Sequence, residues 1–156
     1  MRKIAIWGVL ALMALALAAV PAFAGNPHFI KNATSATQSG NTLTVVFKEA
    51  GLAAGSVETV TASAPATTTY ACVNGGGQIP DAANKQTSTT TVSKSGTFQA
   101  DKNGNIVGSL TLTAPGPEQN SLVCPPGQTE TLQSVSFGNV TLTDTTSGAS
   151  TTVPVR

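Results

Sequence analysis

Few side chains in this 156-residue chain have the types and spacing that catalysis requires. The single histidine is His28, and a serine hydrolase needs a general base beside its nucleophile. No serine stands in a Gly-x-Ser-x-Gly turn that could present one. Copper sites need further nitrogen ligands, and Pro27 has no backbone N–H to give up as one. The sequence therefore predicts neither a serine hydrolase nor a copper site.

Carboxylates are the remaining groups that could act, because pairs of them catalyse glycoside hydrolysis. The acidic residues are Glu49, Glu58, Asp81, Asp101, Glu118, Glu130 and Asp144. Most of them fall at the ends of expected strands or in turns, where contact with solvent explains them. Asp101, Asn103 and Asn105 have the spacing of a calcium loop, but Ile106 and Leu112 stand where an EF-hand needs glycine and glutamate. We expect no enzyme activity, no cofactor and no metal.

The first 24 residues have the three parts of a secretory signal peptide. Residues 1–3 are Met-Arg-Lys, residues 4–20 are largely apolar, and Ala22-Phe-Ala24 is a small-x-small exit. We expect cleavage between Ala24 and Gly25, and an uncleaved membrane anchor is the alternative. Residues 25–156 then form a single domain, which we expect to be secreted and extracellular.

The two cysteines, Cys72 and Cys124, are predicted to form a disulfide, because cysteines of exported proteins usually pair. Each stands beside a stretch with little strand character, residues 73–84 and residues 125–128. A disulfide holds its Cα atoms roughly 5.5–6 Å apart, so both loops must emerge from one region. Such loops commonly carry binding function, although pinning them is a structural role that would suffice. The candidate contact residues are Asn74, Gln78, Ile79, Asp81, Asn84 and Gln128.

Alternation of apolar and polar residues predicts strands throughout the chain after residue 24. Leu43, Val45 and Phe47 occupy every second position, which is typical of a half-buried strand. Similar stretches are residues 29–36, 57–64, 67–73, 87–92, 96–100, 105–113, 129–137 and 140–146. Glycine and proline separate them, with Pro65 between two of the stretches.

The Asn103-Gly104 pair predicts a tight hairpin turn that joins residues 96–100 to residues 105–113. The inward side chains would be those of Phe98, Ile106, Leu110 and Leu112. The whole pattern predicts an all-β fold, an antiparallel immunoglobulin-like Greek-key sandwich of about 7–9 strands with one disulfide. A small barrel is the alternative.

Two resemblances support this interpretation. Residues 29–34, 47–52, 70–77, 100–105 and 124–128 resemble a set of uncharacterised small secreted actinobacterial proteins, which implies no activity. Gly51-Leu-Ala-Ala-Gly55 and Ala100-Asp-Lys-Asn-Gly104 are similar to segments of the neocarzinostatin-type enediyne apoproteins. That family consists of immunoglobulin-like sandwiches that carry a chromophore, so the resemblance implies the sandwich fold. Its two short-range disulfides differ from the single long-range pair here, and no binding residues carry over.

Charge limits the choice of partner. After residue 24, six basic and seven acidic residues leave a formal charge of −1, with no basic stripe to contact phosphates. We expect a protein, glycan or small molecule at the cell exterior as partner, no nucleic acid, and no membrane after leader cleavage. The predicted function is a secreted non-catalytic binding module or an envelope or matrix structural module. The alternatives are a carrier of a small apolar ligand and an inhibitor of secreted proteases.

Overall fold

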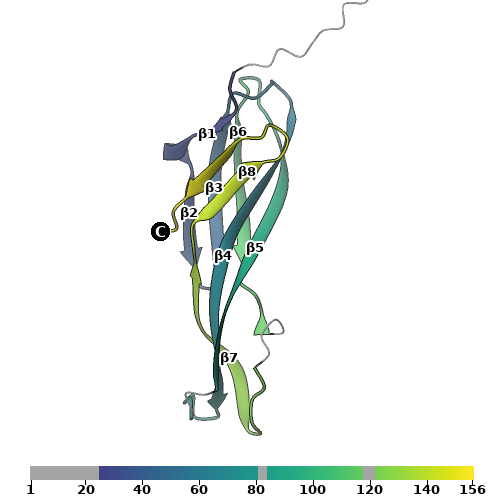
Figure 1. Cartoon of the computed structure of the whole chain (residues 1–156). Coiled ribbons are helices and arrows are strands. Elements are labelled where there is room, and N and C mark those ends of the chain that lie inside the picture. The colour runs from purple at the N-terminus through teal and green to yellow at the C-terminus, as the bar shows by residue number, and fades with distance from the viewer. Residues whose placement is uncertain (1–24, 81–83, 118–121) are drawn as a thin grey trace, which may run out of the picture.

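The computed structural model describes residues 25–80, 84–117 and 122–156, and the predicted leader lies outside this range. Strands dominate the described residues, with one short 3-10 helix (Figure 1). In chain order the elements are β1 (His28–Phe29), η1 (Lys31–Ala33), β2 (Ser35–Ser39), β3 (Thr42–Ala50), β4 (Val57–Asn74), β5 (Lys85–Gln99), β6 (Ile106–Thr113), β7 (Gln128–Phe137), β8 (Val140–Asp144) and β9 (Ser150–Val153). Within these stretches no helix has the length and hydropathy needed to cross a membrane.

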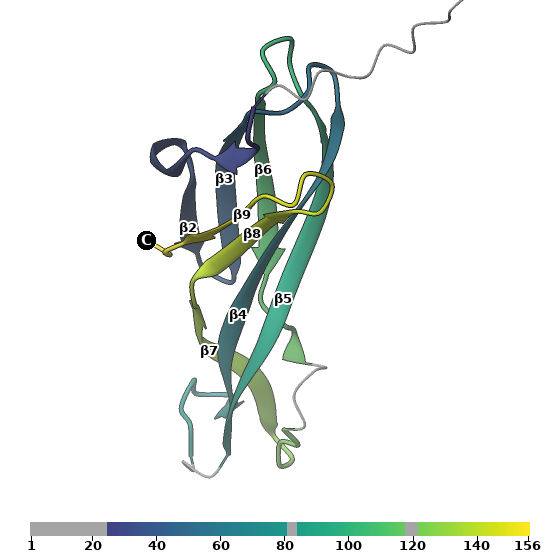
Figure 2. The ribbon, with the colours of Figure 1, turned by 45° about the horizontal axis from the view of Figure 1, so that its top comes forward.

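The strands form two antiparallel sheets, each built around one central strand. In the first sheet β3 pairs with β1 and β2 along one edge and with β6 along the other. In the second sheet β5 pairs with nearly all of β4, while β8 and β7 pair with successive parts of its other edge. The last strand, β9, pairs with β8. As Figure 2 shows, β4 and β5 therefore run along the length of an elongated molecule.

The connections are those of an immunoglobulin-like Greek key. The chain passes between the sheets from β3 to β4, from β5 to β6 and from β6 to β7. Beyond β9, Val155 forms a parallel bridge with Ala36, and the backbone N–H of Arg156 donates to the carbonyl oxygen of Ala36 at 3.0 Å. The last strand of the second sheet thus meets the edge of the first, and the predicted sandwich is confirmed.

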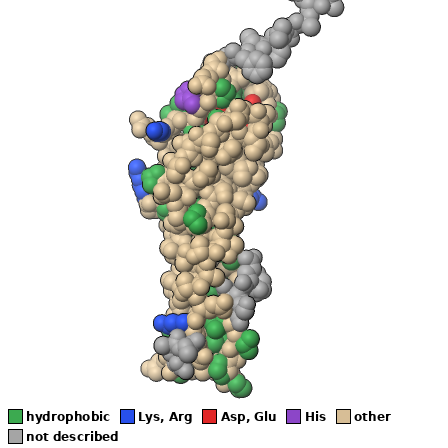
Figure 3. All heavy atoms as spheres, in the orientation of Figure 1, with side chains coloured by type: hydrophobic (Ala, Val, Ile, Leu, Met, Phe, Trp, Pro, Cys, Tyr) green, Lys and Arg blue, Asp and Glu red, His purple; other side chains and the backbone are tan. Residues whose placement is uncertain are grey.

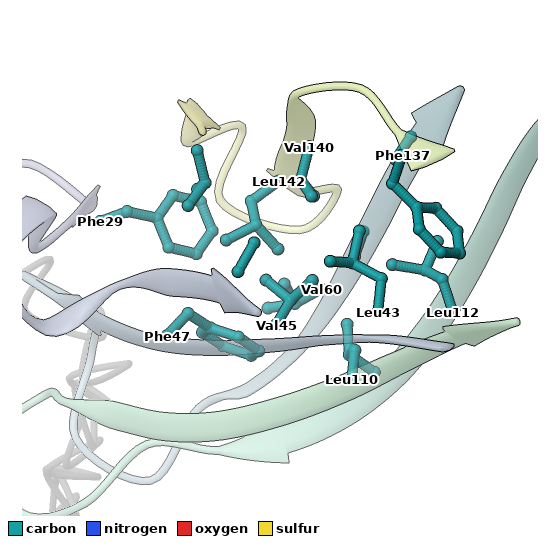
Figure 4. Packing of buried hydrophobic residues seen from close by; sticks show 14 of the residues in the cluster. Phe29, Leu43, Val45, Phe47, Val60, Leu110, Leu112, Phe137, Val140 and Leu142 are labelled. Carbon is teal, nitrogen blue, oxygen red and sulfur yellow. The ribbon is translucent and has the colours of Figure 1, made fainter. Parts of the chain in front are cut away.

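The core follows the alternation of the sequence. Leu43, Val45 and Phe47 are fully buried on the inner face of β3, and they face Val60 and Leu142 of the second sheet (Figure 4). The Phe47 ring makes edge-to-face contacts with the rings of Phe29 and Phe98, at centroid distances of 5.9 and 5.1 Å. Ile106, Leu110 and Leu112 are buried as predicted, and Phe98 is half-buried against this core.

Pro65 does not divide a strand, contrary to the prediction. Residues 57–64 and 67–73 belong to one strand, β4, and residues 87–92 and 96–99 belong to β5, which ends at Gln99. The β8 ladder on β4 covers residues 60–63 and the β7 ladder begins at Ala66, so Pro65 lies at the junction between them. Its carbonyl accepts the N–H of Gly138 at 2.8 Å, and its missing N–H interrupts no ladder.

The turn at residues 101–105 is present, but the hairpin predicted around it is wrong. Oδ1 of Asp101 accepts the backbone N–H groups of Asn103 and Asn105 at 2.8 and 2.9 Å, and Gly104 has a positive φ of 72°. However, β5 pairs with β4 whereas β6 pairs with β3. The turn therefore carries the chain from one sheet to the other, because β6 finds its ladder partner in β3. The short strand β9 was not predicted.

Candidate functional site

The disulfide predicted from the sequence is present and organises one end of the molecule. Cys72 and Cys124 are bonded, with their Cα atoms 5.4 Å apart. Cys72 is fully buried near the end of β4, and Cys124 precedes β7, which pairs with that same part of β4. The bridge therefore joins the two loops beside it, as expected. We call residues 74–80, 84 and 122–128, which are the described residues of the two loops and the strand ends beside them, the distal tip.

Five of the six predicted contact residues lie in the distal tip. Asn74 pairs with Gln128 across β4 and β7, and the N–H of Cys72 donates to the carbonyl of Asn84 at 3.0 Å. The side-chain oxygen of Asn74 accepts the N–H groups of Gly76 and Gln78, each at 3.0 Å, which folds residues 74–78 into a compact turn. Gln78 is exposed, whereas Asn74, Ile79, Asn84 and Gln128 are partly buried. The sixth residue, Asp81, lies outside the described residues.

The distal tip also exposes apolar side chains. Val123 is 87% exposed, and Pro125 and Pro126 beside it are exposed as well. Figure 3 shows hydrophobic side chains gathered at this end, on a surface that is otherwise mostly polar and uncharged. Beneath the tip, the hydroxyl of Tyr70 donates to the carbonyl of Pro115 at 2.9 Å and so ties β4 to the segment that leads towards Cys124. Exposed amides and apolar groups on a braced scaffold form a surface suited to contact.

The opposite end of the molecule holds a feature that sequence analysis missed. Glu49 and Asp144 are fully buried and Glu58 is 4% exposed, so the expectation that solvent explains these acids is wrong. Each one continues an inward-facing apolar stripe: Glu49 follows the stripe of β3, Glu58 precedes that of β4 and Asp144 ends that of β8. Because the three stripes enter one interior, the three carboxylates gather there. We call them the carboxylate cluster.

The carboxyl group of Glu49 has a raised pKa. Burial raises its pKa from 4.5 to about 7, and the nearby charge of Asp144 adds to this effect. The hydroxyl of Ser147 donates to Oε1 of Glu49 at 3.1 Å, which opposes the rise by stabilising the charged form. Near neutral pH, Glu49 therefore holds a proton for part of the time.

The cluster has fewer hydrogen-bond donors than its oxygens could accept. Ser56 donates to one oxygen of Glu58, and the N–H groups of Thr146 and Ser147 donate to Oδ1 of Asp144 at 2.8 and 3.3 Å. The second oxygen of each of the three carboxylates is buried without a hydrogen-bond partner. Among the described residues no lysine, arginine or histidine forms an ion pair with them. Such burial of unpaired carboxylates is costly to stability.

A cavity of about 440 Å³ opens beside the cluster. Its wall includes Glu58 and also Ser147, whose hydroxyl donates to Glu49. The rest of the wall is largely apolar and comes from three loops at this end. The lining residues are Pro27, Gly51, Leu52, Ala53, Ser56, Val57, Glu58, Thr146 and Ser147.

His28, Asp101 and possible metal ligands were the other candidates for a functional site. In the part of the chain that the structure describes, no three His, Cys, Asp or Glu side chains are placed to hold a metal ion. His28 is exposed, and its Nδ1 lies 2.7 Å from the carbonyl oxygen of Asn26. Hydrogen bonds from the turn to its carboxylate lower the pKa of Asp101, so this side chain stabilises the turn at residues 101–105.

Comparison with known proteins identifies no relative. No family model matches the chain, and neither a curated protein nor a solved structure is significantly similar to it.

Proposed function

We propose that the protein is an exported, non-catalytic binding module that contacts its partner through the distal tip. One observation carries the proposal: the disulfide and the β4–β7 ladder bring the two loops together and brace them beneath exposed amide and apolar groups. A contact surface held in advance loses less conformational entropy on binding than a flexible one. The partner we expect at the cell exterior is a protein, a glycan or a small molecule.

The chemistry of the tip favours binding over catalysis. The described tip residues include amides, prolines and aliphatic side chains, and none of them is a histidine or an acid. The carboxylate cluster belongs to the opposite end, where Glu49 and Asp144 are fully buried. A disulfide that closes a separation of 52 residues also suits an oxidising compartment.

Export can be tested by the intact mass of the protein recovered from its own culture medium, with and without reduction. We expect the mass of residues 25–156, two hydrogens lighter before reduction than after it, and no alkylation of the unreduced protein. Recovery with residues 1–24 attached would contradict cleavage of the leader, and free thiols would contradict the braced tip.

The contact function can be tested with two matched double variants. Gln78→Ala with Val123→Ser removes an amide and an exposed valine from the tip, whereas Asn139→Ala with Val107→Ser makes the same changes away from it. Val123 is 87% exposed and Val107 73%, so both variants should fold. Retention of labelled protein on isolated cell envelopes of the producing organism should fall at least tenfold for the tip variant alone. Equal retention of both variants and the unchanged protein would overturn the role of the tip.

A further inference from the structure

We propose that the cavity beside the carboxylate cluster binds a primary ammonium group. Two sources carry this chemistry: the α-amino group of Gly25, created if the leader is removed, and a small free amine with an apolar body. The inference concerns the end of the molecule opposite the tip and does not depend on the contact function. Only its first source depends on leader cleavage.

The need for a cation follows from the cluster itself. Three carboxylates, all at least 96% buried, each keep one oxygen without a donor. Glu58 is the member of the cluster that lines the cavity, and an ammonium group there would supply N–H donors and a positive charge beside its carboxylate. For Glu49, burial and the nearby charge of Asp144 both oppose ionisation, and a cation beside the cluster would offset that cost.

The cavity indicates what kind of cation fits. A metal ion would need several carboxylates converging on one point, and the described residues offer no such group of three. The wall formed by Pro27, Leu52, Ala53 and Val57 is instead apolar, with Glu58 and Ser147 as polar groups on it. A space of about 440 Å³ falls within the range of small-molecule sites. The arrangement therefore suits an organic ammonium ion whose carbon chain lies against the wall.

The nearest source of such a group is the chain itself. Gly25 lies against Gly51, which lines the cavity: a Cβ on Gly25 would be 3.5 Å from the Cα of Gly51. A Cβ on Gly51 would in turn come within 2.5 Å of the carbonyl oxygen of Asn26, so only glycine allows this close approach. Pro27, two residues after Gly25, is part of the cavity wall, and two residues span at most about 7 Å. Removing the leader would turn the neutral amide nitrogen of Gly25 into an ammonium group at this position.

The test compares the chain that begins at Gly25 with a chain that carries Gly-Ser-Gly-Ser in front of it. The extension moves the positive charge by up to about 14 Å without altering any other residue. Thermal unfolding at pH 7 is recorded for both chains, alone and with n-hexylamine, and 1-hexanol serves as the uncharged control. The pKa of the α-amino group is followed by NMR titration in the chain that begins at Gly25.

Each source gives its own result. If Gly25 supplies the ammonium group, its chain should unfold at least about 4 °C above the extended chain, and its α-amino pKa should exceed the ordinary 7.7–8.0. Hexylamine should then stabilise only the extended chain. If the site serves a free amine, hexylamine should stabilise both chains equally. No difference between the chains together with no effect of hexylamine beyond that of hexanol would overturn the proposal.

Variants separate the cluster from general electrostatic attraction. Glu58→Gln should abolish the stabilisation by either ammonium source, and it should fold because it removes an unpaired buried charge. Asp101→Asn is the matched control, since Asp101 is an exposed acid in a turn that packs against Leu52 at the same end. Stabilisation that survives Glu58→Gln, or that Asp101→Asn removes equally, would contradict binding at the cluster.

Discussion

The two ends of this sandwich lie at opposite ends of β4 and differ in how they affect stability. Glu58 and Asn74 stand near the two ends of β4, roughly 50 Å apart at the usual rise per residue. At the distal tip, irregular loops that would otherwise be poorly held are joined by a covalent bond. At the other end, regular strands carry three acids into the interior, where little compensates their charge.

The distal tip gains stability from its disulfide, whereas the carboxylate cluster lowers the stability of the folded chain. A disulfide acts mainly on the unfolded chain and leaves the side chains of the tip available for contact. Buried carboxylates act on the folded chain and make its stability depend on pH and on whichever cation is present. Changes at the tip should therefore alter stability by the same amount at every pH, whereas changes at the cluster should not.

The largest effect should come from opening the disulfide. In Cys72→Ser with Cys124→Ser, we expect the free energy of unfolding to fall by about 4 kcal/mol, because the unfolded chain regains the entropy of a 52-residue separation. Urea unfolding at pH 5 and at pH 8 measures this loss. A loss that differs between the two pH values by more than about 1 kcal/mol would show that the two ends are coupled.

Protonation of Glu49 should give the next largest effect. The folded chain binds this proton with a pKa of about 7, whereas the unfolded value is 4.5. The free energy of unfolding should thus be highest below pH 4.5, fall between pH 4.5 and 7, and lie about 3 kcal/mol lower above pH 7. The difference between the parent and its Glu49→Gln variant isolates this term, and both should carry the N-terminal extension so that no ammonium group contributes. Parallel stability curves for the two proteins would contradict the raised pKa.

The sequence held more information about the cluster than its acid composition suggested. Alternation placed Leu43, Val45 and Phe47 inward, and the same parity continues to Glu49. Extending the inward parity of Val140 and Leu142 by one step likewise places Asp144 inside. The acids were assigned to solvent because they stand at strand ends, where parity still decides which way a side chain points. The sandwich was predictable because the alternation of apolar and polar residues is a local pattern. The disulfide was predictable because the cysteines of exported proteins usually pair.

Other features depended on neighbours that no local pattern reveals. Pro65 is compatible with a long strand only because two different strands meet beside it. The turn at residues 101–105 was identified from its own residues, but the sheet to which β6 belongs is set by its pairing with β3. The cavity similarly requires loops from residues 27, 51–53, 56–58 and 146–147 to meet. Long-range pairing, rather than residue type, decided each of these outcomes.

A smaller effect at the cluster should follow from removing one donor. Ser147→Ala deletes the hydroxyl that donates to Glu49 at 3.1 Å, and with it an interaction that lowers the pKa of Glu49. The variant should lose about 1 kcal/mol of unfolding free energy at pH 8, and less at pH 5 where Glu49 is protonated. Ser150→Ala removes a nearby hydroxyl that donates to the carbonyl of Leu142, and it serves as a control whose loss should not vary with pH. An equal loss at both pH values for Ser147→Ala would exclude a role in charge stabilisation.

The smallest effect on stability should come from the tip variant, Gln78→Ala with Val123→Ser. Gln78 is exposed and Val123 is 87% exposed, so unfolding should change by no more than about 0.5 kcal/mol at any pH. The same variant should show the largest loss of retention on cell envelopes, because the tip keeps its shape and loses only what it presents. A loss of stability comparable to that of the disulfide variant would mean that these side chains hold the tip together. The two ends would then both be structural, and the contact surface would have to be sought on the faces of the sheets.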